Sequence, residues 1–230
     1  MPALPHIELV ICDCDGTLVD SLAAISETFR QVLAAHGLPS IERAVVQRYV
    51  GLPVRALFDE RLPELTEEQR HTLQLAYRQL YPQIAAGQTP LFDGVRGALA
   101  KLRRRGVRLA IATGKSLAGV RRFLAEESLE GTFEAVRCAD TAARPKPYGD
   151  MVEEILQETG VAPRRAVMVG DTPFDIQMGR AAGVATCGVT TGGFTSAELA
   201  EHQPTLLLPR FTDLVAWLPS TANGTGGASV

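Results

Sequence analysis

The sequence lacks any apolar run long enough to cross a bilayer, since a membrane-spanning helix needs about 20 consecutive apolar residues. Its first apolar stretch, Leu9 to Cys12, is short and is followed at once by Asp13 and Asp15. A secretion signal would need a longer uninterrupted apolar segment. We therefore expect neither a membrane anchor nor a signal peptide.

Cysteine is scarce, with four residues in 230, and these lack the dense, regular spacing of a disulfide scaffold. We expect them to be reduced and the protein to be cytoplasmic. An excess of basic residues is also missing, because the net charge is -3 and the pI is near 5.9. Nucleic acids and anionic membranes attract basic surfaces, so neither is an expected partner. A small metabolite is the better candidate, and both a monomer and a homodimer remain open.

Six short apolar runs have the character of buried parallel strands, and helical patterns separate them. The expected strands are Ile7–Cys12, Arg108–Thr113, Ala135–Ala139, Arg165–Gly170, Ala185–Val189 and Thr205–Leu208. The expected helices are Gly94–Arg105, Ser116–Glu126, Tyr148–Thr159, Phe174–Ala182, Thr195–Glu201 and Phe211–Leu218. This alternation predicts an α/β fold, a Rossmann-like parallel sheet covered by helices on both faces.

Between Asp20 and Gln88 the alternation stops, over an interval much longer than the roughly 30 residues of a βαβ unit. Thr66-x-x-Gln69 within it has the spacing of a capping box at a helix start. We predict an inserted helical cap subdomain over residues 20–88, a core made of residues 1–19 and 89–219, and a disordered tail over 220–230. The expected cap helices are Ser21–Ala35, Ile41–Val50, Pro53–Arg61 and Thr66–Ala86.

Two aspartates, Asp13 and Asp15, follow the first expected strand. Alternate side chains of an extended chain share a face, so both should project at the carboxyl edge of the sheet, where open α/β sheets bind ligands. Neighbouring carboxylates repel unless a cation neutralises them or one holds a proton. That suits one ionised nucleophile and metal ligand beside one proton carrier. The alternative is a plain acidic turn.

A second acidic pair, Asp171 and Asp175, follows the strand Arg165–Gly170 and should emerge at the same edge. Carboxylate oxygens gathered in this way suit a hard cation such as Mg²⁺. Pro173 is expected to be the first helical residue, which places Asp175 in a first turn where the helix dipole alone can stabilise it. Asp171 precedes the helix, so a bound metal explains an aspartate at this position better than the helix dipole does.

Phosphate-binding donors are present in Thr113-Gly114-Lys115 and in Lys146. Thr113, the backbone N–H groups beside it and the helix start at Ser116 can donate to phosphate oxygens. Lys146 stands between two prolines, and we expect it in an extended segment as a fixed charge. Taken singly these are an ordinary strand end and a solvated lysine. Taken together with the aspartates they indicate a phosphate site.

The ordered set Asp13-x-Asp15-Gly16-Thr17, Thr113-Gly114, Lys146-Pro147 and Gly170-Asp171-x-x-x-Asp175 resembles the four motifs of the haloacid dehalogenase superfamily. The insertion after the first motif is similar to that superfamily's type 1 cap, and the resemblance extends to Leu218. It implies a magnesium-dependent phosphatase with a phosphoaspartate intermediate.

In the mechanism that this resemblance implies, Asp13 attacks phosphorus, while Asp15 protonates the leaving oxygen and then activates water. Mg²⁺ is held by Asp13, Asp171 and the carbonyl of Asp15. Asp175 supports the metal site. The transferring phosphoryl group is bound by Thr113, Gly114 and Lys146.

The segments Gly51-Leu52-Pro53-Val54-Arg55 and Gly192-Gly193-Phe194 resemble bacterial phosphoglycolate phosphatases more loosely. They suggest 2-phosphoglycolate as the substrate, with Arg55 gripping its carboxylate and Arg48 as a rival for that role. The alternative for Arg55 is a solvated helix residue. Asp15 disfavours a dehalogenase, whereas a phosphotransferase such as a sugar phosphomutase and a non-catalytic phospholigand-binding module both remain open.

Overall fold

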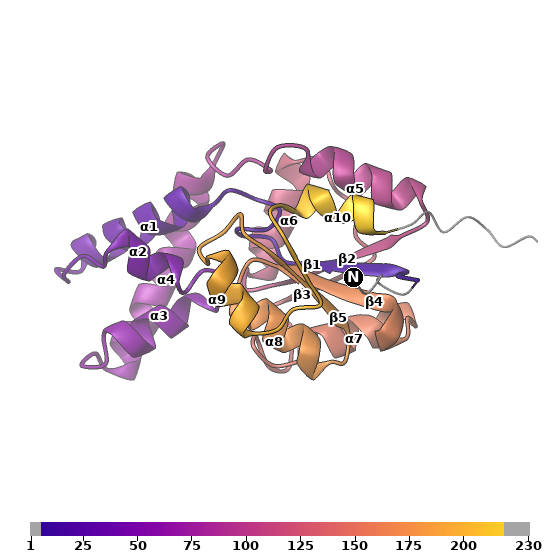
Figure 1. Cartoon of the computed structure of the whole chain (residues 1–230). Coiled ribbons are helices and arrows are strands. Elements are labelled where there is room, and N and C mark those ends of the chain that lie inside the picture. The colour runs from indigo at the N-terminus through magenta and orange to yellow at the C-terminus, as the bar shows by residue number, and fades with distance from the viewer. Residues whose placement is uncertain (1–5, 219–230) are drawn as a thin grey trace, which may run out of the picture.

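The computed structural model describes residues 6–218, so the predicted disordered tail lies outside the described residues. A parallel six-stranded sheet forms its centre, in the order β3-β2-β1-β4-β5-β6 (Figure 1). All six strands lie where the sequence predicts them, with ends that differ by two residues at most. Their bounds are β1 Leu9–Cys12, β2 Arg108–Thr113, β3 Ala135–Cys138, β4 Ala166–Gly170, β5 Ala185–Val189 and β6 Leu206–Leu208.

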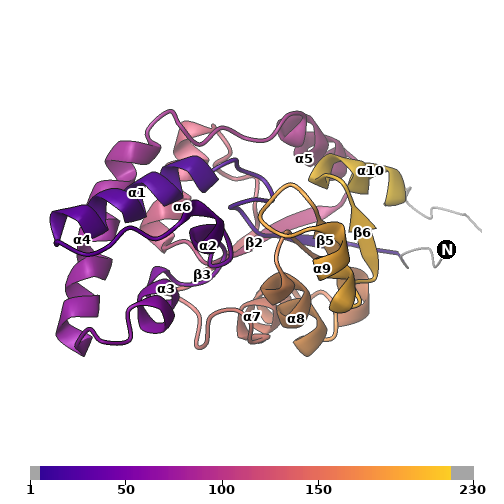
Figure 2. The ribbon, with the colours of Figure 1, turned by 60° about the vertical axis from the view of Figure 1, so that its left-hand side comes forward.

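Helices cover both faces of the sheet (Figures 1 and 2). Alternation along β1 explains this, because Leu9 and Ile11 pack into one hydrophobic cluster while Val10 and Cys12 pack into the other. The first cluster includes α7 (Asp150–Thr159) and α8 (Pro173–Ala181), and the second includes α5 (Val95–Arg104), α6 (Leu117–Glu126) and α10 (Leu214–Trp217). The predicted α/β fold is confirmed.

Smaller elements complete the core. Helix α9 (Ser196–Glu201) packs with β6, and 3₁₀ turns span Pro163–Arg165 (η1) and Phe211–Asp213 (η2). The sequence predicts one helix over Phe211–Leu218, but η2 and α10 divide this segment. Phe211 is buried against α5, which anchors the segment where it divides.

Four helices stand between β1 and α5 and form a hydrophobic cluster of their own around Phe29, Phe58 and Tyr77. They are α1 (Leu22–Ala35), α2 (Arg43–Gln47), α3 (Val54–Arg61) and α4 (Glu67–Ala85). Helix α4 begins with the predicted capping box, in which Thr66 and Gln69 bond each other's backbone N–H at 3.2 and 2.8 Å.

Helix α2 is shorter than the predicted Ile41–Val50. Its end tightens into i→i−3 hydrogen bonds at Arg48, Tyr49 and Val50, a common way to satisfy the last carbonyls of a helix. These turns lead to Gly51, whose φ of 92° turns the chain toward the sheet.

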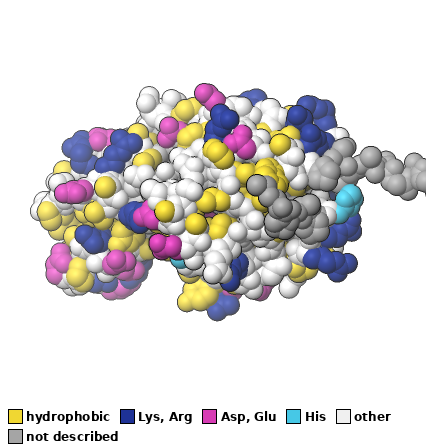
Figure 3. All heavy atoms as spheres, viewed as in Figure 1, with side chains coloured by type: hydrophobic (Ala, Val, Ile, Leu, Met, Phe, Trp, Pro, Cys, Tyr) yellow, Lys and Arg dark blue, Asp and Glu magenta, His cyan; other side chains and the backbone are white. Residues whose placement is uncertain are grey.

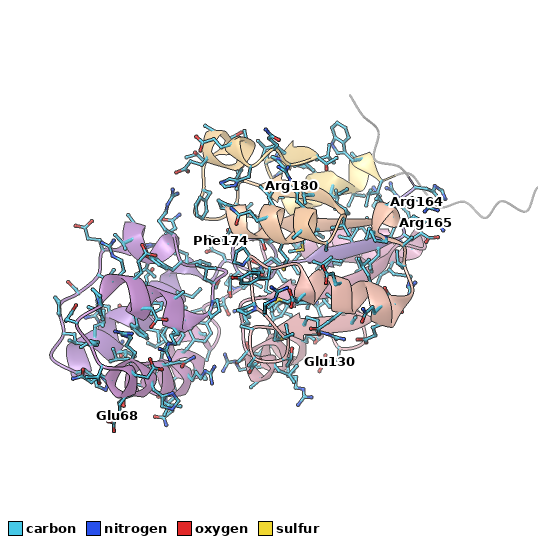
Figure 4. The ribbon with its side chains drawn as sticks, turned by 90° about the horizontal axis from the view of Figure 1, so that it is seen from below. Glu68, Glu130, Arg164, Arg165, Phe174 and Arg180 are labelled. Atoms are coloured by element: carbon cyan, nitrogen blue, oxygen red, sulfur yellow. The ribbon has the colours of Figure 1, made fainter. Side chains whose placement is uncertain are left out.

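The α1–α4 helices lie at one end of the sheet, beside the N-terminus of α8. Phe174, the second residue of α8, lies on the side of the core that faces them (Figure 4). On the face drawn in Figure 3, acidic and basic side chains are interspersed over these helices. No helix within residues 6–218 is both long enough and apolar enough to cross a bilayer. All four cysteines are buried and unpaired.

Close packing of α8 on the sheet generates a stability prediction. A Cβ at Gly179 would lie 2.6 Å from Cγ2 of Thr186 and 2.9 Å from Cβ of Met168, so α8 would have to move. We expect Gly179→Ala to lower the free energy of unfolding by about 1–3 kcal/mol in urea titrations, although alanine is the better helix former. The control is Gly97→Ala in α5, where an added Cβ meets nothing within 4 Å. Equal effects of the two changes would contradict the packing argument.

Candidate active site

Lys146 is the central cation at the carboxyl edge of the sheet. Its Nζ lies 2.8 Å from Oδ1 of Asp13 and 2.6 Å from Oδ1 of Asp175, and all three side chains are buried. The extended segment predicted for Lys146 is wrong. The residue lies in a turn, closed by a 3.2 Å hydrogen bond from the Tyr148 N–H to the Pro145 carbonyl. The turn leads the chain into α7 and directs the ammonium back to the sheet edge.

Three carboxylates, from Asp13, Asp171 and Asp175, each place an oxygen within 4.8 Å of the others. Oδ1 of Asp171 accepts a 2.8 Å hydrogen bond from the Thr17 hydroxyl. Oδ2 of Asp171 and Oδ2 of Asp13 are buried without a hydrogen-bond partner. Buried carboxylate oxygens normally have partners, so this donor set fits a hard cation such as Mg²⁺.

The N-terminus of α8 fixes the position of Asp175. Oδ2 of Asp175 accepts from the backbone N–H and the hydroxyl of Thr172, at 3.0 and 2.7 Å. Thr172 accepts in return from the Asp175 N–H at 3.3 Å, and Pro173 is the first helical residue, as the sequence predicts. The spacing Thr172-x-x-Asp175 is itself a helix-start pattern, so this role of Thr172 was accessible from the sequence although it was missed.

The electrostatics of these groups show a shortage of positive charge. Burial, with Asp175 and Asp15 nearby, raises the pKa of Asp13 to about 7, even though Lys146 opposes the shift. Burial raises the pKa of Asp171 as well, and the charge of Asp13 adds to the shift. Burial alone would lower the pKa of Lys146, but Asp13 and Asp175 outweigh it and the pKa is raised. The cluster therefore strongly favours an added cation.

Asp15 pairs with a second lysine, Lys115. Its Oδ1 lies 2.6 Å from Nζ of Lys115 and accepts a hydrogen bond from the Ser21 hydroxyl. Lys115 also donates to the hydroxyl of Tyr81, in α4, at 3.3 Å. The roles of Ser21 and Tyr81 were missed, because no local pattern pairs a residue of α4 with the end of β2. The metal contact expected of Asp15 involves its backbone carbonyl and stays a prediction.

The loop after α2 lies directly on the sheet edge. A Cβ at Gly114 would be 2.4 Å from the carbonyl oxygen of Gly51, so only glycine permits this approach. A Cβ at Gly51 would be 3.9 Å from Oδ2 of Asp13. Thr113, buried at the end of β2, precedes the contact. The structure therefore brings Thr113 and Gly114 to the same edge as the aspartates.

A cavity of about 420 Å³ lies between this edge and the α1–α4 helices. Asp15, Gly114 and Lys115 line it from the core. Tyr49, Tyr77 and Tyr81 are among the residues that line it from the helices. Asp15 and its partner Lys115 therefore both border the cavity.

Arg55 does not line this cavity. Its guanidinium binds Glu67 through two nitrogens and also contacts Asp59 at 3.2 Å. Arg48 pairs with Glu198 at 2.6 Å and lies 4.1 Å from the ring centroid of Phe194. Neither arginine lines the cavity in this structure, and the expectation that Arg55, or Arg48 as its rival, binds the substrate stays a prediction. Arg55 is held by partners 4 and 12 residues away in the sequence, and Arg48 by a partner 150 residues away.

Comparisons with known proteins agree with this geometry. The model of the family "Haloacid dehalogenase-like hydrolase" matches residues 10–189. "Probable phosphatase IndB" of Dickeya dadantii is 33% identical over 90% of this chain and 91% of its own. "Tyrosine-protein kinase PtkA" of Mycobacterium tuberculosis is 34% identical over 87% of this chain and 68% of its own. "Phosphoglycolate phosphatase 1" of Pseudomonas aeruginosa is 30% identical over 90% of this chain and 78% of its own.

The fold also matches solved structures. A predicted phosphoglycolate phosphatase from Haemophilus somnus superposes with a TM-score of 0.84 at 23% identity, over 93% of this chain and 98% of the other. The family model extends from the second residue of β1 to the last residue of β5 and includes the aspartates described above. The chain therefore belongs to the haloacid dehalogenase-like hydrolase family, as a phosphoric monoester hydrolase.

Proposed function

We propose that the protein is a Mg²⁺-dependent phosphatase that hydrolyses a small phosphate monoester through a phosphoaspartate on Asp13. The observation that carries the proposal is the charge balance at the sheet edge. Four buried carboxylates lie there with two ammonium groups, which contact Asp13, Asp15 and Asp175 but not Asp171, so full ionisation would leave two negative charges in excess. Asp13, Asp171 and the Asp15 carbonyl would hold the ion, and Asp175 would support it. Bound Mg²⁺ supplies compensation for the negative charge of the phosphoryl group.

The proposal assigns a residue to each chemical step. A carboxylate oxygen of Asp13 attacks phosphorus, the bond to the leaving oxygen breaks, and a proton from Asp15 passes to that oxygen. Asp15 then takes a proton from water, whose oxygen attacks the phosphoaspartate and releases phosphate. Lys115, 2.6 Å from Oδ1 of Asp15, holds that carboxyl group in position for both proton transfers. Lys146, Thr113 and the Gly114 backbone would align the phosphoryl oxygens.

We propose that the α1–α4 helices act as a cap. Gly51 lies against Gly114 and close to Asp13, so in this arrangement the helices shield the nucleophile from solvent. Exclusion of water strengthens the charge interactions of the site and protects the phosphoaspartate until one water is admitted. We further propose a cytoplasmic location, where the four buried thiols stay reduced.

The name of one relative makes 2-phosphoglycolate the first substrate to assay. If it is turned over, Arg78 and Arg122, which line the cavity, are better placed than Arg55 to bind its carboxylate. The name of another relative raises transfer to an acceptor other than water. Release of inorganic phosphate, measured against formation of a phosphorylated alcohol acceptor, separates the two activities.

Replacement of the nucleophile tests the central assignment. We expect Asp13→Asn to lower turnover by at least about a thousandfold, because the amide has no anionic oxygen to attack phosphorus. Its melting temperature without metal at pH 8 should not fall, since the change removes a poorly compensated buried charge. The control is Asp20→Asn, an exposed aspartate nearby, which should keep full activity. Comparable activity in the two variants would remove Asp13 from its role.

Removal of the metal tests the charge balance. EDTA should abolish activity, and Mg²⁺ but not Ca²⁺ should restore it, because Ca²⁺ accepts a looser geometry that spoils alignment. The pKa of Asp13 is raised to about 7, so the metal-free protein loses stability as the pH rises toward 7. Mg²⁺ should therefore raise the melting temperature more at pH 8 than at pH 5. Full activity in EDTA would contradict the proposal.

Asp15→Asn separates the two chemical steps. Hydrolysis of an alkyl phosphate should fall by about 10²–10⁴-fold, because its leaving oxygen needs a proton. With p-nitrophenyl phosphate, whose leaving group needs none, the variant should release one burst of p-nitrophenol and then stall at the phosphoaspartate. A rapid-quench measurement of the burst checks this. Steady turnover at the parent rate would show that Asp15 carries no proton.

A further inference from the structure

The cavity beside Asp15 is where the leaving group must lie, an inference that rests on the proposed function. Asp15 lines the cavity, whereas Asp13 is completely buried and does not. Since the leaving oxygen receives its proton from Asp15, the alcohol part of the substrate has to extend from that oxygen into this space. The walls of the cavity therefore determine which alcohol fits.

Those walls are mostly apolar and aromatic. Phe29, Tyr77 and Tyr81 form a continuous series, with ring centroids 4.6 Å apart for the first pair and 5.6 Å for the second, which is stacked with an interplanar angle of 11°. Tyr81 is half-buried and reaches Lys115, the partner of Asp15. An aromatic wall thus leads from the acid–base group into the helices. Leu57 and Tyr49 also line it.

The volume of the cavity is large for glycolate. A leaving group of about five non-hydrogen atoms fills at most ~150 Å³, even if each atom takes the space of a water molecule. The cavity holds about 420 Å³, within the range of pockets that enclose far larger organic molecules. An alcohol as small as glycolate would leave most of this volume unfilled.

We propose that the preferred substrate is the phosphate monoester of an alcohol that carries a ring-sized apolar group, which packs on the wall formed by Phe29, Tyr77 and Tyr81. Offset stacking and removal of apolar surface from water would favour such a group. The ring would lie between this wall and Ala118 of α6, which lines the cavity from the core side.

A matched set of substrates tests the proposal. Ethyl phosphate and 2-phenylethyl phosphate both release primary alcohols, so their difference reports the ring and not the chemistry of the leaving oxygen. We expect kcat/KM for 2-phenylethyl phosphate to exceed that for ethyl phosphate and for 2-phosphoglycolate by about tenfold to a hundredfold, as discrimination in apolar pockets commonly does. A ratio below about tenfold, or a preference for 2-phosphoglycolate, overturns the proposal.

Filling the cavity provides the second measurement. Ala118→Leu adds a side chain at an exposed helix position that lines the cavity, where leucine is well tolerated by the helix. It should lower kcat/KM for 2-phenylethyl phosphate by about tenfold and leave ethyl phosphate within about twofold. Ala125→Leu is the control, an exposed position of the same helix that does not line the cavity. Equal losses on both substrates from Ala118→Leu, or none, contradict the placement of the ring.

Binding without turnover distinguishes failure of this inference from failure of the proposed function. If no monoester is hydrolysed with Mg²⁺ present, the proposed function fails. Calorimetry with 3-phenylpropylphosphonate and propylphosphonate then still tests the cavity in the parent protein. Binding of the phenyl compound about tenfold tighter supports the inference, and equal affinities overturn it.

Discussion

More negative than positive charge is buried at the carboxyl edge of the sheet, and the rest of the site depends on this imbalance. Lys146 contacts Asp13 and Asp175, Lys115 contacts Asp15, and Asp171 has no lysine partner. Burial and the neighbouring carboxylates raise the pKa of Asp13 and of Asp171. Uncompensated charge inside a protein destabilises the fold, so such an arrangement persists where a ligand offsets it. A divalent cation and a phosphoryl group, bound together, meet that requirement.

The fold holds these charges together because parallel strands end at one edge. β1 delivers Asp13 and β4 delivers Asp171 in adjacent strands, while α8 presents Asp175 from its first turn. Each of these carboxylates has a support of its own. Lys146 contacts Asp13, the Thr17 hydroxyl donates to Asp171, and Thr172 at the start of α8 donates to Asp175. Repelling groups can stay close only when such separate supports fix them, and that rigidity is what alignment of a phosphoryl group requires.

The core and the α1–α4 helices contribute different residues to the site. The core supplies the aspartates and lysines at the sheet edge, and the helical part supplies Gly51, which lies against Gly114, and the aromatic wall of the cavity that Asp15 lines. Tyr81 connects the two parts through Lys115, so the aromatic wall proposed to bind the alcohol is linked by one lysine to Asp15, the proposed proton donor. Selectivity can therefore change in the helices while the chemistry stays constant.

The sequence alone determined the strands, most helix bounds, the capping box at Thr66 and the order of the four motifs, because strand and helix patterns depend on neighbours a few residues away. It also brought Asp13 and Asp171 to one edge, since parallel strands must end there. Only the tertiary structure decided that Lys115 pairs with Asp15, that Lys146 lies in a turn and that Arg55 binds Glu67 and not the cavity. The Lys115–Asp15 pair joins segments far apart in the chain, while the turn at Lys146 and the Arg55–Glu67 pair depend on turn and side-chain geometry. Strand and helix patterns encode neither, because they record only which residues are apolar.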